Sequence, residues 1–238
     1  MNEGGREREA EGGRRHRPTI IPSALAVGAV IFDFNGTLSH DEPILCEIFC
    51  ELFAEHGRPL SAQEYFETLA GLSDPDIVRT WLGPDHPAVD EVIDQRVARY
   101  RARVADGSSV PDEVRAAVRY AAERVPVGIV SGAAHAEIDA VVEAAGFGGV
   151  FAAVVAAEDV AQGKPHPDGY LRALELLDRG LDPGDVLVFE DTEAGIASAK
   201  AAGMQCIAVL GTLAPERLAA ADELVPQLDV EVMSRVLR

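Results

Sequence analysis

The sequence predicts an α/β fold in which a doubly wound parallel sheet carries an inserted helical domain. Short, almost continuous apolar runs alternate with helical patterns along the 238-residue chain, and one long helical stretch interrupts the alternation after the first run. Apolar runs of this kind are typical of parallel strands that helices cover on both faces. The expected strands are residues 27–33, 127–131, 151–155, 186–190 and 206–210.

Several of the intervening helices have recognisable ends. Pro111 stands at the start of one helix, where a backbone N–H is not needed. A second helix, residues 135–145, stops at Gly146, a residue that favours a helix C-terminus. Thr192 can cap a third helix that runs to Ala202. These ends support the alternation of strands and helices in the second half of the chain.

The long helical stretch divides the chain into its expected parts. Because the stretch follows the first strand directly, residues 41–106 are expected to form a helical cap domain over the carboxyl end of that strand. Residues 23–40 and 107–238 would form the core domain. Residues 1–22 are rich in Gly, Arg and Glu without apolar periodicity, which indicates a disordered N-terminal tail. The cap helices are expected at residues 43–56, 61–69, 74–82 and 88–104.

The composition excludes some classes of partner. The formal net charge is -19, whereas non-specific binding to nucleic acid or to an anionic membrane needs a basic surface. No stretch is long and apolar enough to cross a bilayer. The three cysteines are an odd number in a chain too long for a disulfide scaffold, which indicates a reducing cytoplasm. We expect a cytoplasmic monomer or homodimer that binds neither nucleic acid nor membrane.

Four polar groups follow four of the expected strands. Residues 33–37, with the sequence Asp-Phe-Asn-Gly-Thr, follow the first strand, and Ser131 ends the second. Lys164 lies after the third strand, and Glu190 and Asp191 end the fourth. Ligands of open parallel sheets bind beyond the carboxyl ends of the strands, where the strand order reverses. The four groups are therefore expected to converge on one site.

These residue types suit phosphoryl transfer. A carboxylate such as Asp33 can attack phosphorus to form an acyl-phosphate that water then hydrolyses. Because two anions repel each other, the attack needs a cation, and Asp33 with Asp191 offers the carboxylate oxygens that Mg²⁺ prefers. Lys164 adds a positive charge, and Ser131 with neighbouring backbone N–H groups can bind a phosphate oxygen. One Mg²⁺ and one lysine would balance the three carboxylates of the site.

The four motifs stand in an order that resembles a known family. Asp-x-x-Gly-Thr, Ser-Gly, Gly-Lys-Pro-x-Pro-Asp and Phe-Glu-Asp-x-x-x-Gly together are similar to the motifs of the haloacid dehalogenase superfamily. Residues 188–204 are especially similar to the subfamily that contains β-phosphoglucomutase and phosphoglycolate phosphatase. The resemblance covers nearly the whole chain from residue 27 onward. It implies a Rossmann-like core with an inserted helical cap.

The resemblance also implies a role for each motif residue. Asp33 is the nucleophile and a Mg²⁺ ligand, and Asn35 offers its backbone carbonyl to the same ion. Asp191 is a ligand, and Glu190 is a ligand or an acid behind the ligands. Three further residues position the phosphoryl group: Thr37, Ser131 and Lys164. The implied activity is Mg²⁺-dependent hydrolysis of a small phosphomonoester, a phosphorylated metabolite, through an aspartyl-phosphate.

Asn35 departs from the pattern of the family. The phosphatases and mutases that the chain resembles usually carry Asp there, which protonates the leaving group and then activates water. Asn cannot exchange a proton near neutral pH, and the missing group is normally worth about 10²–10⁴ in rate. Either the enzyme acts without this acid, or His40, at the entry to the cap, has replaced it. A further alternative is a non-catalytic relative that binds a phosphorylated ligand or a partner.

Three other activities of the superfamily fit the sequence less well. Phosphonoacetaldehyde hydrolases need a cap lysine, and the only lysines here are Lys164 and Lys200. Dehalogenases act without a metal and lack the acidic pair that Glu190 and Asp191 form. Mutases need the missing acid and often an Arg at the position of Asp74, whose charge would repel a second phosphate. A phosphatase is therefore the expected activity.

Overall fold

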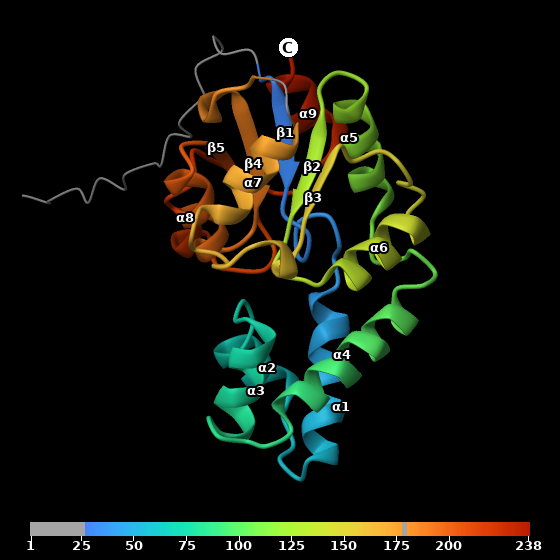
Figure 1. Cartoon of the computed structure of the whole chain (residues 1–238). Coiled ribbons are helices and arrows are strands. Elements are labelled where there is room, and N and C mark those ends of the chain that lie inside the picture. Colours follow the sequence, from blue (N-terminus) through green and yellow to red (C-terminus); the bar gives the residue numbers. More distant parts are fainter. Residues whose placement is uncertain (1–26, 178–179) are drawn as a thin grey trace, which may run out of the picture.

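The computed structural model describes residues 27–177 and 180–238, so the predicted tail of residues 1–22 lies outside the described residues. Six parallel strands form one sheet in the order β3-β2-β1-β4-β5-β6 (Figure 1). This arrangement confirms the predicted α/β fold with a parallel sheet. The strands are β1 (Ala29–Phe32), β2 (Val127–Val130), β3 (Ala153–Val155), β4 (Val186–Glu190), β5 (Gln205–Val209) and β6 (Glu223–Val225).

The sheet contains all five predicted strands and one strand that the sequence analysis missed. β6 has only three residues and begins with Glu223, so it forms no apolar run. It is a strand because it pairs with β5 at the edge of the sheet, a contact that is not local in sequence. β1 lies centrally, with β2 on one side and β4 on the other, so the carboxyl ends of these three strands are neighbours.

Helices cover both faces of this sheet. They are α5 (Asp112–Ala122), α6 (His135–Ala144), α7 (Asp168–Leu177), α8 (Glu193–Ala201) and α9 (Val230–Val236). Successive side chains of a strand point to opposite faces. In β1, Val30 and Phe32 join a buried apolar cluster with α5 and α9, whereas Ala29 and Ile31 join a second cluster with α7 and α8. Figure 1 shows these helices on opposite sides of the strands.

The predicted helix ends are confirmed where the structure describes them. α5 begins directly after Pro111. Gly146, just beyond α6, has a φ of +71°, a left-handed conformation that glycine adopts without strain. The hydroxyl of Thr192 accepts a hydrogen bond from the N–H of Gly195 at 3.1 Å and so caps α8.

Four helices lie between β1 and α5, at the positions that the sequence predicted. They are α1 (Glu42–Glu55), α2 (Ala62–Thr68), α3 (Asp74–Leu82) and α4 (Val89–Arg103). Figure 1 shows them beyond the carboxyl ends of the strands. Phe49, Tyr65 and Tyr100 are buried among them and extend the apolar cluster that contains Phe32. Among the described helices, none has the length and apolar character needed to span a membrane.

Candidate active site

Three carboxylates meet at the carboxyl edge of the central strands. Asp33 follows β1 directly, Glu190 is the last residue of β4, and Asp191 is next to it. Each side chain has one oxygen within 4.8 Å of the others, and all three residues are buried. In the part of the chain that the structure describes, no other group of three acidic, histidine or cysteine residues is this close together. The predicted convergence of the first and fourth motifs is therefore present in the structure.

Lys164 reaches this group from the loop that precedes α7. Its Nζ atom donates hydrogen bonds to Asp33 Oδ1, to Glu190 Oε1 at 2.5 Å and to the backbone oxygen of Val130 at 3.2 Å. The side chain is 16% exposed, so the charge lies inside the protein next to its two partners. The third motif is thus joined to the first and the fourth through a single ammonium group.

Glu190 is held by donors on both of its oxygens. Besides Lys164, the hydroxyl of Tyr170 donates to Oε1 at 2.9 Å. Oε2 accepts from the N–H of Asp191 at 3.0 Å and from the N–H and hydroxyl of Thr192 at 3.2 and 3.1 Å. Gly195 allows this arrangement, because a Cβ at that position would stand 1.7 Å from Oε1. The motif glycine therefore makes room for the carboxylate at the start of α8.

The loop after Asp33 wraps around Asp191. Gly36 has a φ of +80°, and a Cβ there would lie 2.0 Å from Asp191 Oδ2. Glycine is thus required both by the backbone conformation and by the close approach. The hydroxyl of Thr37 donates to Asp191 Oδ1 over a long 3.4 Å. Thr37 therefore contacts the metal-binding candidate itself, and its contact with a phosphoryl group stays a prediction.

Ser131 lies at the neighbouring strand end. It follows β2, is buried, and its Oγ accepts the N–H of Ala133 at 2.9 Å. Its own N–H donates to the backbone oxygen of Val155. The structure therefore places Ser131 at the predicted edge of the sheet, in a tight turn that leads toward α6. The hydroxyl proton is left to donate to an oxygen in the site.

The site carries more negative than positive charge. Burial raises the pKa of Asp33 to about 7; the charge of Lys164 opposes this rise and the charge of Glu190 adds to it. Burial, followed by the charges of Asp33 and Glu190, raises the pKa of Asp191 well above its ordinary value. Burial lowers the pKa of Lys164, but the charges of Asp33 and Glu190 outweigh burial and raise it overall. One lysine thus leaves two of three buried carboxylates uncompensated.

This excess charge and the type of donor atom fit a divalent cation. Carboxylate oxygens are the ligands that Mg²⁺ takes in proteins. Asp33 and Asp191 each have a carboxylate oxygen within 4.8 Å of the other. The single positive charge of Lys164 does not neutralise both carboxylates. The residues present therefore fit the ion that the sequence predicted.

Asn35 has an unexpected partner. Its Nδ2 donates to Asp41 Oδ2 at 2.9 Å, and the hydroxyl of Tyr100 donates to the same oxygen. Asp41 is fully buried. His40, the residue considered as a replacement acid, is exposed, and its backbone N–H donates to the oxygen of Ser109 at 2.7 Å. Asp41 was not predicted as a site residue, because an acidic residue just before a helix indicates a cap rather than a contact with the site.

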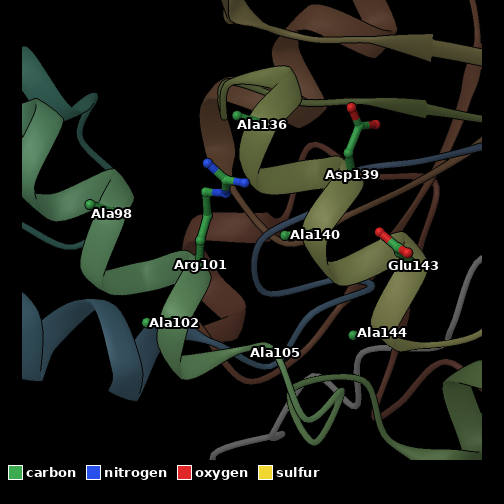
Figure 2. A pocket seen from close by; sticks show the side chains of 9 residues that line it. All are labelled: Ala98, Arg101, Ala102, Ala105, Ala136, Asp139, Ala140, Glu143 and Ala144. Carbon is green, nitrogen blue, oxygen red and sulfur yellow. The ribbon is translucent and has the colours of Figure 1, made fainter.

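A groove of about 850 Å³ lies apart from these residues, between α4 and α6. Figure 2 shows Arg101 extending from α4 toward α6, and Asp139 and Glu143 on α6. The rest of the lining is alanine: Ala98, Ala102, Ala105, Ala136, Ala140 and Ala144. None of the predicted site residues lines the groove. Small side chains thus leave this groove open between α4 and α6.

The fold and the site define an α/β enzyme with a carboxylate site at the point where the order of its parallel strands reverses. Residues 27–203 match the family model of the haloacid dehalogenase-like hydrolases. The chain therefore belongs to the haloacid dehalogenase-like hydrolase family, which confirms the resemblance drawn from the four motifs.

Individual relatives agree with this family. The chain is 34% identical over 196 residues to Protein CbbY of Rhodobacter capsulatus, an alignment that covers 77% of this chain and 85% of that protein. It is 31% identical over 214 residues to Validoxylamine A 7'-phosphate phosphatase of Streptomyces hygroscopicus subsp. limoneus, covering 83% and 92%. A crystal structure of a CbbY mutant from Rhodobacter sphaeroides with xylulose-(1,5)bisphosphate is 26% identical, with a TM-score of 0.73 over 85% of this chain and 95% of that one.

Proposed function

We propose that this hydrolase is a Mg²⁺-dependent phosphatase that cleaves a small phosphomonoester through an aspartyl-phosphate on Asp33. The observation that carries the proposal is the position of Asp33, which is buried between Lys164 and Asp191 at the carboxyl edge of the sheet. A relative named for phosphatase activity on Validoxylamine A 7'-phosphate supports the reaction class. A phosphorylated metabolite with a polar leaving group is the corresponding substrate class.

In the proposed reaction a carboxylate oxygen of Asp33 attacks phosphorus. The bond from phosphorus to the ester oxygen breaks, and the released alkoxide takes a proton from solvent water, because Asn35 cannot supply one. Water then attacks the phosphorus of the aspartyl-phosphate, which restores the carboxylate and releases inorganic phosphate. Lys164 fixes Asp33 Oδ1 and offers positive charge to the phosphoryl oxygens. Ser131 would donate its hydroxyl proton to the same oxygens, and Thr37 would do so once its hydroxyl leaves its long 3.4 Å contact with Asp191.

Asp33, Asp191 and the backbone carbonyl of Asn35 would hold the magnesium ion. When bound, the ion compensates the negative charge of the site so that an anionic phosphate can approach. Glu190 belongs to the acidic group, but Lys164 and four other donors already engage its oxygens. We therefore assign Glu190 to holding Lys164 in place, behind the ligands. Of the two roles that the resemblance left open for Glu190, we propose the second.

The helices α1 to α4 form the proposed cap, residues 41–106. Two short connections, at residues 39–42 and 106–109, join it to the core, and the hydrogen bond from His40 to Ser109 links them. A cap that closes over Asp33 would exclude water from the reacting carboxylate. Such a movement would have to keep or break the buried ion pair between Arg96 of α4 and Glu137 of α6.

Hydrolysis of para-nitrophenyl phosphate tests this function. We expect turnover with Mg²⁺, no turnover after chelation, and loss of activity in Asp33→Ala. Asp112→Ala is the matched control, because that side chain is fully exposed on α5 and should retain full activity. The good leaving group needs little protonation, so Asn35 should not mask the activity. Phosphate binding without turnover would instead favour a non-catalytic phosphate-binding relative.

A further inference from the structure

Asp41 is a buried carboxylate that the reaction as described does not use. It occupies the N-cap position of α1, where an aspartate usually accepts a hydrogen bond from the first turn of the helix. Its side chain makes no such bond, and the residue is 0% exposed. A carboxylate that makes no capping hydrogen bond and is shielded from water needs other hydrogen bonds to offset the cost of its burial.

Those contacts join three separate elements. Asp41 Oδ2 accepts the amide N–H of Asn35 at 2.9 Å, from the loop that begins at the nucleophile. The same oxygen accepts the hydroxyl of Tyr100, a buried residue near the end of α4. The other oxygen, Oδ1, is buried and has no hydrogen-bond partner among the described residues. A single oxygen of Asp41 therefore makes hydrogen bonds to both the loop after Asp33 and α4.

The hydrogen bond fixes the orientation of the Asn35 amide. The carboxylate oxygen of Asp41 can only accept hydrogen bonds, and it already accepts one from the Tyr100 hydroxyl. The NH₂ group of Asn35, which donates, must therefore face Asp41. The amide oxygen of Asn35 then points away from Asp41. Among the described residues, no donor forms a hydrogen bond to that amide oxygen. Asn35 is only two residues from Asp33 in the chain.

We propose that Asp41 is a positioning residue that orients the Asn35 amide beside the nucleophile and ties this orientation to α4 through Tyr100, a role that rests on the proposed phosphatase function. The amide and the carboxylate form a complementary pair, in which position 35 supplies the donor and position 41 the acceptor. Changing one member alone should disrupt the pair. Exchanging both should preserve the hydrogen bond with its direction reversed.

The test is a double-mutant cycle measured with Mg²⁺ and para-nitrophenyl phosphate. Asn35→Asp places two carboxyl groups at hydrogen-bond distance, and this pair has a donor only while one of them is protonated. Above neutral pH, where both ionise, kcat should therefore fall about ten-fold or more while KM changes little. Adding Asp41→Asn restores a donor and an acceptor, and kcat should recover about ten-fold relative to Asn35→Asp. Asp41→Ala should lower kcat about ten-fold, and Asp41→Asn, which keeps an acceptor oxygen, should lower it less.

Two further variants complete the design. Glu47→Ala is the matched control from α1, because its side chain is 72% exposed and lies outside the pair, and its kcat should stay within about two-fold of the wild type. Tyr100→Phe keeps the aromatic ring and removes only the donor to Asp41, so a loss of kcat of about three-fold or more is expected. An unchanged kcat in Tyr100→Phe would overturn the connection to α4.

The outcomes separate this role from the proposed function. A wild type that does not hydrolyse the substrate would refute the phosphatase and, with it, the positioning role. A wild type that turns over, combined with an Asn35→Asp variant that is equally active or that Asp41→Asn does not rescue, would overturn the positioning role alone. Rescue of the melting temperature without rescue of kcat would also overturn it, because the pair would then be a structural contact only.

Discussion

Lys164 donates hydrogen bonds to two buried carboxylates at once, Asp33 and Glu190. Replacing it by methionine keeps most of the length of the side chain and removes the charge. We expect Lys164→Met to lower kcat by about 10²-fold or more, because the charge that faces the transferred phosphoryl group is lost. Steady-state hydrolysis in the presence of Mg²⁺ measures this effect.

The second lysine of the chain provides a matched control for this prediction. Lys200 bonds Asp222 at 2.7 Å on the surface, with a side chain that is 38% exposed. Lys200→Met should leave kcat unchanged and reduce the free energy of unfolding by about 1 kcal/mol or less. Because Lys164→Met also leaves Asp33 and Glu190 without their cation, its kcat is measured well below its melting temperature. A kcat that stays at the wild-type level there would contradict the electrostatic role.

At the scale of elements, α4 is joined to α6 by a buried ion pair. Arg96 of α4 pairs with Glu137 of α6 and bonds Asp74 at 2.7 Å. The side chains of Arg96 and Glu137 are 5% and 2% exposed, so neither charge has water as an alternative partner. Arg96→Met should therefore lower the free energy of unfolding by about 3 kcal/mol or more, measured by chemical denaturation.

Arg99, one turn away on the same helix, is the control for this variant. Its side chain is 30% exposed and bonds Glu55 at 2.7 Å. Arg99→Met should cost about 1 kcal/mol or less, because an exposed ion pair contributes little. Equal losses in the two variants would contradict the special role of the buried pair between α4 and α6.

The elements that the sequence predicted well are those with local signals. Thr192 and Gly146 mark helix ends through contacts or conformations within a few residues, and the structure confirms both. β6 was missed because its pairing with β5, rather than its own composition, makes it a strand. Asp41 was not predicted as a site residue for a related reason, since its local position suggests a cap and its contacts with Asn35 and Tyr100 are not local.

At the scale of the whole molecule, the order of four motifs was enough to predict one site. Parallel strands bring their carboxyl ends to one edge, so the convergence of Asp33, Lys164 and Asp191 follows from topology. The internal geometry of the site does not follow in the same way. The five donors that hold Glu190 come from a strand end, a loop and a helix, and only the folded chain brings them together.

The charge of the site also affects the stability of the whole molecule. The pKa of Asp33 is raised to about 7 in the metal-free protein, so the folded state binds this proton more tightly than the unfolded chain does. The contribution of Asp33 to stability is therefore fully present below its unfolded pKa of 3.8 and is lost as the pH rises toward 7. Mg²⁺ binds the deprotonated carboxylates and should restore stability where this loss is greatest.

Melting temperatures with and without Mg²⁺ test this linkage. We expect the increase on adding Mg²⁺ to be larger at pH 8 than at pH 5.5, because Asp33 is protonated at the lower pH and must release a proton to bind the ion. In Asp33→Asn this pH dependence should be reduced, since one titrating ligand is absent. An equal increase at both pH values in the wild type would contradict the assignment of Asp33 as a ligand.

The central claim, that Asp33 is the nucleophile, is tested most directly by trapping the covalent intermediate. Acid quenching during turnover, followed by peptide mass spectrometry, should find one phosphoryl group on Asp33 in the wild type and none in Asp33→Asn, which should also be inactive. An Asp33→Asn variant that turns over at the wild-type rate, or a phosphoryl group trapped on another residue, would contradict the account.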